Sequence, residues 1–186
     1  MCPVAHHDIN GDIPPEARRM VREAYAAYLG LVFCLLFNFF CTSAALGVLG
    51  SDYIGSFLWA AIYMLGGIPG AFFSWYMRAY AAGQHDRALS YVGFFCLFPA
   101  HLVFSIWSAV APPFAAGKSH AGFMAGLGML RKSTGVGVVY LIGASFWSIE
   151  SLWSVWLLQD MYMHFRGGNR RGQIASEGLA MASRGV

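Results

Sequence analysis

The chain has 186 residues, of which 58% are hydrophobic, 16% aromatic and only 11% charged. Soluble domains carry about a quarter charged residues, so this composition excludes an ordinary water-soluble enzyme. The formal net charge of +3 is small and dispersed along the chain, which excludes a nucleic-acid-binding protein with the basic stripe that such proteins need.

Residues 1–23 form a polar head that precedes the apolar part of the chain. Pro14 and Pro15 predict the start of a short helix there, because proline is tolerated in the first helical turn. Asp12 is the candidate N-cap of this helix, since an aspartate side chain accepts hydrogen bonds from free backbone N–H groups. The head lacks the pattern of a cleavable signal peptide, so we expect the first apolar stretch to direct membrane insertion.

Four long stretches nearly free of charge predict four membrane-spanning helices. Residues 24–51, 53–77 and 88–117 contain no Lys, Arg, Asp or Glu, and residues 133–159 contain only Glu150. About 20 apolar residues suffice for a helix to cross a bilayer. We therefore expect an all-α integral membrane protein, a four-transmembrane-helix bundle over residues 24–159, with spans at 25–49, 54–75, 89–111 and 135–158.

The connections between the predicted spans differ in length. Residues 50–53 form a minimal turn, so the first two spans must be antiparallel neighbours. Residues 76–87 form an amphipathic linker, and residues 114–132 form a longer connection rich in glycine. A polar tail with several glycines and arginines occupies residues 160–186.

The distribution of Lys and Arg predicts the orientation in the membrane. Nine lie in the head, the second connection and the tail, whereas three lie in the connection between the last two spans. Basic residues accumulate on the cytosolic side. Both termini and residues 76–87 are therefore expected in the cytosol.

Three polar side chains inside the predicted spans need an explanation. Asn38 is expected to hydrogen-bond across helices, with ligand binding as the alternative. Glu150 must be neutral, paired or in contact with water, because an unpaired carboxylate in lipid is costly. His101 is its candidate partner: the pair forms either a proton relay or a single hydrogen bond that fixes helix register, with Ser148 or Ser151 as alternative partners.

Signatures of catalysis are absent from the sequence. Gly117-Lys118-Ser119 resembles the end of a phosphate loop, but Pro112 stands where the required glycine belongs. His, Cys, Asp and Glu do not occur at metal-ligand spacing. The sequence predicts no catalytic residues, no metal site and no cofactor.

Several stretches together resemble the secretory carrier-associated membrane proteins in their plant and algal form. Residues 109–167 carry the strongest resemblance, with "AVAPPFAAGKSHAG" leaving the third span and "YLIGASFWSIESLWSVWLLQDMYMHFRG" over the fourth. The segments "HHDINGDIP", "LGLVFCLLFN" and "FSWYMRAYAAGQHDRALSYVGFF" are similar too. The family's long head with Asn-Pro-Phe repeats is not matched, so we expect either a short form of the family or a trimmed one.

The resemblance implies a multi-pass protein of the trans-Golgi, recycling endosomes, secretory vesicles and plasma membrane, with both termini cytosolic. It also implies that residues 75–87 act at the membrane and meet acidic phosphoinositides. The residues that correspond to this interface segment are Trp75, Tyr76, Arg78, Tyr80 and Arg87. The family's Arg-Pro pair is replaced by Met77 and Arg78, so we expect weak attraction to anionic lipid, at about 1 kcal/mol per basic residue.

We therefore predict a non-enzymatic protein of post-Golgi vesicle trafficking that acts at its cytosolic face. Its expected partners are the lipid bilayer, anionic lipids or phosphoinositides, trafficking proteins and a second copy of itself, but not nucleic acid. The candidate lipid contacts are the arginines near the two ends: Arg18, Arg19, Arg22, Arg166, Arg170 and Arg171. The alternative hypothesis is a small proton-coupled transporter or channel that uses Glu150 and His101.

Overall fold

The computed structural model describes residues 8–114 and 119–167. All regular structure in these ranges is helical. The helices are α1 (Ile9–Asp12), α2 (Pro15–Leu49), η1 (Ser51–Tyr53), α3 (Ile54–Ala71), η2 (Phe72–Tyr76), α4 (Met77–His85), α5 (Ala88–Val110), α6 (Phe123–Leu130) and α7 (Thr134–Gly167).

Four helical segments are long and apolar enough to cross a membrane, which confirms the predicted all-α four-span fold. They are Pro15–Leu49, Ser51–His85, Ala88–Val110 and Thr134–Gly167. A helix of 35 residues is roughly 50 Å long, which exceeds the hydrocarbon thickness of about 30 Å. The longer spans therefore project beyond the hydrocarbon.

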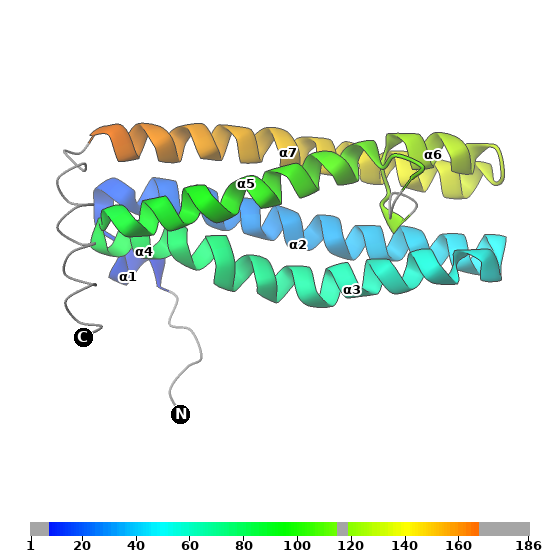
Figure 1. Cartoon of the computed structure of the whole chain (residues 1–186), viewed down its shortest axis with the longest axis horizontal. Helices are drawn as coiled ribbons and strands as arrows, with labels where there is room; N and C mark the ends of the chain where they lie inside the picture. Colours follow the sequence, from blue (N-terminus) through cyan, green and yellow to red (C-terminus); the bar gives the residue numbers. More distant parts are fainter. Residues whose placement is uncertain (1–7, 115–118, 168–186) are drawn as a thin grey trace, which may run out of the picture.

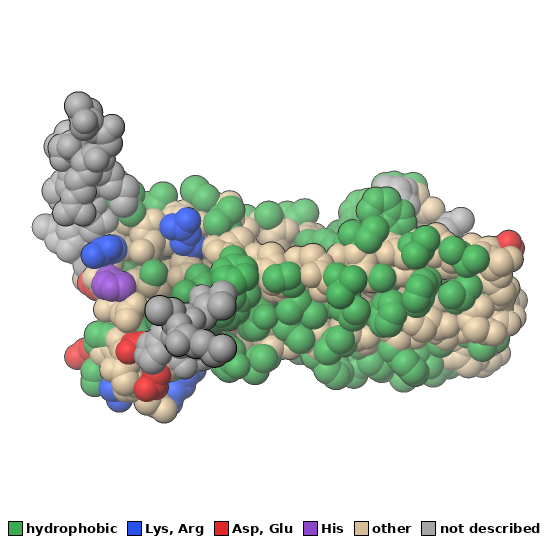
Figure 2. Space-filling model, turned by 90° about the horizontal axis from the view of Figure 1, so that it is seen from below, with side chains coloured by type: hydrophobic (Ala, Val, Ile, Leu, Met, Phe, Trp, Pro, Cys, Tyr) green, Lys and Arg blue, Asp and Glu red, His purple; other side chains and the backbone are tan. Residues whose placement is uncertain are grey.

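The spans lie side by side along the long axis of the molecule (Figure 1). The beginning of α2, the end of α7 and α4 lie at one end, which we call the charged end. Figure 2 shows that most of the Lys, Arg, Asp, Glu and His side chains visible in that view gather at the charged end. An acidic side chain is also visible at the opposite end, and hydrophobic side chains cover most of the length between.

The first span begins earlier than predicted, because the head helix and the span are one continuous helix. Pro15 occupies the first turn of α2, and Pro14 precedes it with an extended ψ of 146°. The prediction that Asp12 caps this helix is wrong, since no side chain caps the N-terminus of α2. Asp12 instead ends the short helix α1, whose N-cap is Asp8.

The second span also continues further than predicted. Pro69 lies inside α3 and has no backbone N–H to give to the helix. A π-helical turn, η2, follows it and leads directly into α4. Turns of this kind absorb one extra residue within a helix. Residues 77–85 therefore extend the second span, although we expected them to form a separate linker.

The connection between the last two spans folds back into the bundle. Helix α5 ends at Val110, where Ala111 adopts a left-handed conformation with φ 47°. Figure 1 shows the chain descending from this point toward α2 and α3 before α6 begins. Helix α6 lies alongside the first half of α7, and Gly126 of α6 fits against Leu141 of α7.

Candidate functional site

The strongest candidate site is a buried polar network between α5 and α7. His101 Nε2 lies 3.3 Å from Glu150 Oε1, and the two side chains are only 4% and 5% exposed. Ser154 completes the network: its hydroxyl lies 3.0 Å from His101 Nε2 and donates to Glu150 Oε1 at 3.4 Å. The structure therefore brings together the two residues that the sequence pairs.

The alternative partners predicted for Glu150 are wrong. Ser148 and Ser151 donate to the backbone carbonyls of Ala144 and Trp147, each at 2.8 Å. Ser154 takes their place because it lies one helical turn from Glu150, on the same face of α7. This spacing is visible in the sequence and is the signal that identifies Ser154.

A glycine makes space for the Glu150 carboxyl group. Gly30 of α2 faces α7, and a Cβ atom added there would collide with Glu150 Oε2. Alanine is a better helix former than glycine, so helix propensity disfavours glycine at this position. Close approach of the carboxylate accounts for the glycine at residue 30.

Asn38 pairs with the inward-folded connection rather than with a neighbouring helix. Its Nδ2 donates to the Ser119 carbonyl at 2.9 Å, and its Oδ1 accepts from the Ala121 N–H at 2.7 Å. Non-helical backbone at membrane depth is tolerated where it is buried in protein. Asn38 supplies the two hydrogen bonds that this backbone needs.

His120 lies in the same connection and is buried against aromatic rings. Its ring stacks on Tyr63 at 4.9 Å, and its Nδ1 lies 3.1 Å from the Ser108 hydroxyl. Burial penalises the imidazolium and lowers the pKa of His120 to about 4. This residue is absent from the predicted site residues, because a histidine in a connection carries no sequence signal of burial.

The aromatic residues predicted to contact the membrane interface face the interior of the protein. Trp75, Tyr76 and Tyr80 are 2%, 0% and 3% exposed. Tyr76 stacks on Tyr28 at 5.4 Å, and Trp75 packs edge-on to Phe98 at 5.0 Å. The prediction that these rings belong to a membrane-contacting interface segment therefore needs correction, because η2 and α4 continue α3, and Trp75 and Tyr76 of η2 face α5 and α2.

Tyr80 joins α1 to α4 at the charged end. Its hydroxyl accepts from the Asp8 N–H at 3.1 Å and donates to Asp12 Oδ2 at 2.8 Å. Gly83 of α4 has no space for a side chain, because Val21 of α2 occupies it. The described part of the head is therefore fixed to α4. Arg78 and Arg87, by contrast, are exposed.

The predicted lipid-contacting arginines divide into two groups. Arg18, Arg19 and Arg22 lie together on α2 beside a cavity of about 550 Å³ that Trp153 of α7 also lines. Arg166 is exposed and lies over the Tyr162 ring at 5.8 Å. Arg170 and Arg171 lie outside the described residues.

Each arginine beside this cavity has a partner within the chain. Arg18 donates to the Ile13 carbonyl at 2.8 Å, and Arg22 donates to Asn10 Oδ1 at 2.7 Å. Arg19 pairs with Glu23 at 2.7 Å. A guanidinium has five N–H donors, so these bonds orient the side chains and leave further donors for a ligand.

Comparison with known proteins gives consistent results. A family model described as "SCAMP family" matches residues 1–168. "Secretory carrier-associated membrane protein 2" of Oryza sativa subsp. japonica is 39% identical over 98% of this chain and 63% of its own length. "Secretory carrier-associated membrane protein 1" of Arabidopsis thaliana is 37% identical over 97% of this chain and 64% of its own length. The chain thus spans less than two thirds of these curated relatives, and no solved structure matches it significantly.

Proposed function

The chain belongs to the secretory carrier-associated membrane protein (SCAMP) family, and we propose that it is a non-enzymatic membrane protein of post-Golgi vesicle trafficking. The names of its relatives support an association with secretory carriers. The compartments we propose are the trans-Golgi, recycling endosomes, secretory vesicles and the plasma membrane.

The charged end is proposed to face the cytosol. Support comes from the excess of basic residues in the head, the second connection and the tail, which follows the positive-inside rule. In this orientation α1, α4, the start of α2 and the end of α7 form the cytosolic surface. Trafficking proteins that bind this surface would contact these packed helices.

The mechanism we propose is contact between this surface and anionic lipid headgroups such as phosphoinositides. The observation that carries it is the cavity beside Arg18, Arg19 and Arg22, where three guanidinium groups are already oriented by partners in the chain. Oriented side chains lose less conformational freedom on binding. Arg78 and Arg87 add exposed positive charge at the same end.

One observation favours a second candidate function, proton-coupled transport. The 3.3 Å contact between His101 and Glu150 places two titratable groups together inside the spans. Intramembrane ionisable pairs of this kind occur in proton relays. The same contact also fits a purely structural hydrogen bond, and replacement of Glu150 by glutamine separates the two hypotheses.

Localisation of the tagged full chain tests the trafficking role. We expect it to co-migrate with post-Golgi vesicles and to remain in membranes after washing at high salt. Confinement to mitochondria or plastids would contradict the proposal.

Binding of a fluorescent phosphoinositide to the reconstituted full chain tests the mechanism. Joint replacement of Arg18, Arg19 and Arg22 by glutamine should weaken binding about 100-fold, at about 1 kcal/mol per basic residue. The control replaces the exposed Arg131 and Lys132, at the opposite end, by glutamine. Equal affinity of the two variants would exclude the arginine cavity as the binding site.

A further inference from the structure

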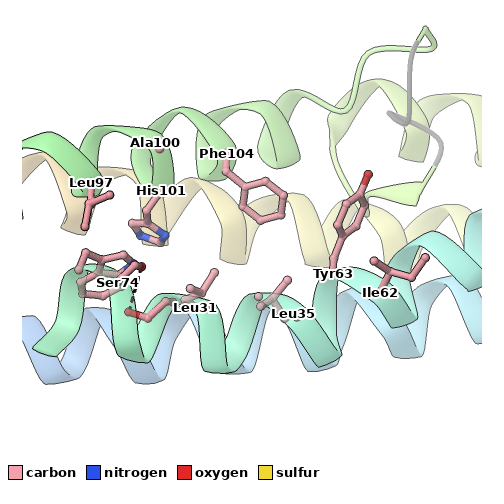
Figure 3. Close-up of a pocket in the computed structure, with 14 residues that line it drawn as sticks. Leu31, Leu35, Ile62, Tyr63, Ser74, Leu97, Ala100, His101 and Phe104 are labelled. Carbon is pink, nitrogen blue, oxygen red and sulfur yellow. Dashed lines mark hydrogen bonds between the residues drawn. The ribbon is translucent and has the colours of Figure 1, made fainter.

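A groove of about 450 Å³ runs between α3 and α5, and α2 forms its floor. Figure 3 shows His101 and Phe104 reaching from α5 toward α3, and Tyr63 reaching from α3 toward α5. Ile62 and Leu97 line the groove and are exposed in the middle of spans, so it opens toward lipid. Its volume lies within the range of sites for small molecules, about 300–1,000 Å³.

One wall of the groove is flat and apolar. Gly66, Gly67 and Gly70 of α3 line it, and a Cβ atom added at Gly66 or Gly70 would meet nothing within 4 Å. Leu31 and Leu35 of α2 contribute the floor. A rigid, flat, apolar molecule fits such a wall better than a branched one.

Trp75 and His101 line the end of the groove nearest the charged end. The indole Nε1 of Trp75 is buried and has no hydrogen-bond partner. The His101 ring lies beside it, with a centroid distance of 4.9 Å. Within residues 8–114 and 119–167, the polar contacts found for the His101 ring, with Ser154 and Glu150, use Nε2. An unpaired buried donor is destabilising, which points to a ligand that supplies the acceptor.

The tautomer of His101 indicates which chemical group fits. Because Ser154 donates to Glu150, its oxygen is available to accept from His101 Nε2, and we assign the ring proton to Nε2 on this basis. His101 Nδ1 is then an acceptor. A hydroxyl group can accept from the Trp75 N–H and donate to His101 Nδ1, whereas an ester carbonyl only accepts.

We propose that this groove binds one sterol molecule from the leaflet nearest the charged end. A sterol carries a single hydroxyl at one end of a rigid, flat, apolar ring system, which matches the polar pair, the glycine wall and the apolar remainder. From Ser74 of η2 to Ile62 of α3 the groove follows the second span for roughly 18 Å. The hydroxyl would point toward the charged end, as an amphipathic lipid in that leaflet requires.

The rigidity of the ligand distinguishes a sterol from the acyl chain of a phospholipid. A flexible chain loses rotamer freedom when it is held in a groove, whereas fused rings have little to lose. An acyl chain also offers nothing to the Trp75 N–H or to His101 Nδ1. The sterol site does not depend on the trafficking role, so either proposal can fail alone.

Photolabelling of the full chain in phosphatidylcholine vesicles tests the sterol site. The probe is a sterol with an intact hydroxyl and a diazirine on its ring system. We expect light to attach it to peptides within residues 62–75 and 97–104, with competition by unlabelled sterol. A 3-keto sterol lacks the hydroxyl proton and should compete about two- to tenfold more weakly, which is the worth of one hydrogen bond.

Variants of α3 provide the matched controls. Gly66→Leu fills the groove and should lower labelling at least tenfold. Gly55→Leu lies on the same helix, in equally open space but away from the groove lining, and should label like the natural protein. Trp75→Phe keeps an aromatic ring but removes the N–H donor, and should weaken labelling about two- to tenfold.

Two results overturn the proposal. One is equal labelling of the natural protein and of Gly66→Leu, with the thermal unfolding midpoint of the variant unchanged. The other is labelling of the groove by a phospholipid with a diazirine on its acyl chain, when excess sterol does not reduce this labelling. That second result would assign the groove to an acyl chain.

Discussion

At the scale of single residues, Glu150 shows how a carboxyl group is accommodated inside a membrane-spanning helix. An isolated charge at this depth costs several kilocalories per mole. His101 and Ser154 lie within 3.4 Å of one carboxyl oxygen, and Gly30 gives the other oxygen space. The residues come from three helices, so the network fixes how α2, α5 and α7 sit relative to one another.

Replacement of Glu150 by glutamine tests the two hypotheses for this pair. Glutamine keeps the shape and the acceptor oxygen, so we expect the thermal unfolding midpoint in detergent to change little. Proton uptake by proteoliposomes, followed with a pH-sensitive dye, should be the same for both proteins if the contact is structural. A measurable flux that disappears in Glu150→Gln would support the relay.

Gly30→Ala is expected to destabilise the protein, although alanine favours helices. The added Cβ collides with Glu150 Oε2. The carboxyl group must shift, which weakens the contacts of its Oε1 with His101 and Ser154, at about 1–3 kcal/mol. Gly47→Ala is the control, since it lies on the same helix in open space and should stabilise by about 0.5–1 kcal/mol. Thermal unfolding measures both, and a Gly30→Ala midpoint equal to the control would contradict the prediction.

At the scale of elements, the connection from α5 to α7 is the feature that departs most from a simple four-helix bundle. Asn38 hydrogen-bonds to residues 81 and 83 positions away in the chain. A Cβ atom added at Gly122 would meet the Ser108 carbonyl oxygen and Ala111, so the chain packs closely against the end of α5 there. The position of α6 therefore depends on Asn38 and Gly122, which both lie outside that helix.

Asn38→Ala is expected to loosen this connection. The substitution leaves the Ser119 carbonyl and the Ala121 N–H buried without partners, at about 1–3 kcal/mol each. Ser43→Ala is the control, because that hydroxyl only donates to Phe39 on its own helix. Hydrogen exchange should increase over residues 119–130 in Asn38→Ala alone, and unchanged protection there would mean that Asn38 does not hold the segment.

The same connection makes stability depend on pH through His120. Its pKa falls from the usual 6.5 to about 4 when the protein folds, so between these values the unfolded chain binds the extra proton. The contribution of His120 to the free energy of unfolding is therefore fully present above pH 6.5 and declines as the pH falls toward 4. Between pH 7 and pH 5 the free energy of unfolding falls by about 2 kcal/mol. Thermal unfolding of the natural protein and of His120→Phe should differ in this pH dependence, and parallel curves would contradict it.

At the scale of the whole molecule, the four spans place alternate connections on opposite sides of the membrane. In a Cys2→Ser, Cys96→Ser background, which also removes the exposed Cys96 thiol, Ser51→Cys and Arg87→Cys introduce exposed thiols at the two ends of the second span. A membrane-impermeant maleimide should reach Ser51→Cys from one side of sealed vesicles and Arg87→Cys only from the other. Labelling of both from the same side would show that Ser51–His85 does not cross.

The sequence by itself determined the four spans and paired Glu150 with His101. Both follow from local composition: an uncharged stretch of sufficient length must cross the bilayer, and a carboxylate inside one must find a partner. The cytosolic orientation also comes from the sequence, and it stays a prediction.

Only the tertiary structure decided which way the side chains of each span face. Trp75, Tyr76 and Tyr80 turn inward, and Asn38 reaches a connection rather than a helix. Lipid and protein interior are both apolar, so a span that is hydrophobic on all sides carries no amphipathic pattern to mark its buried face. Close packing at residues such as Gly30 and Gly83, together with hydrogen bonds between distant parts of the chain, selects that face instead.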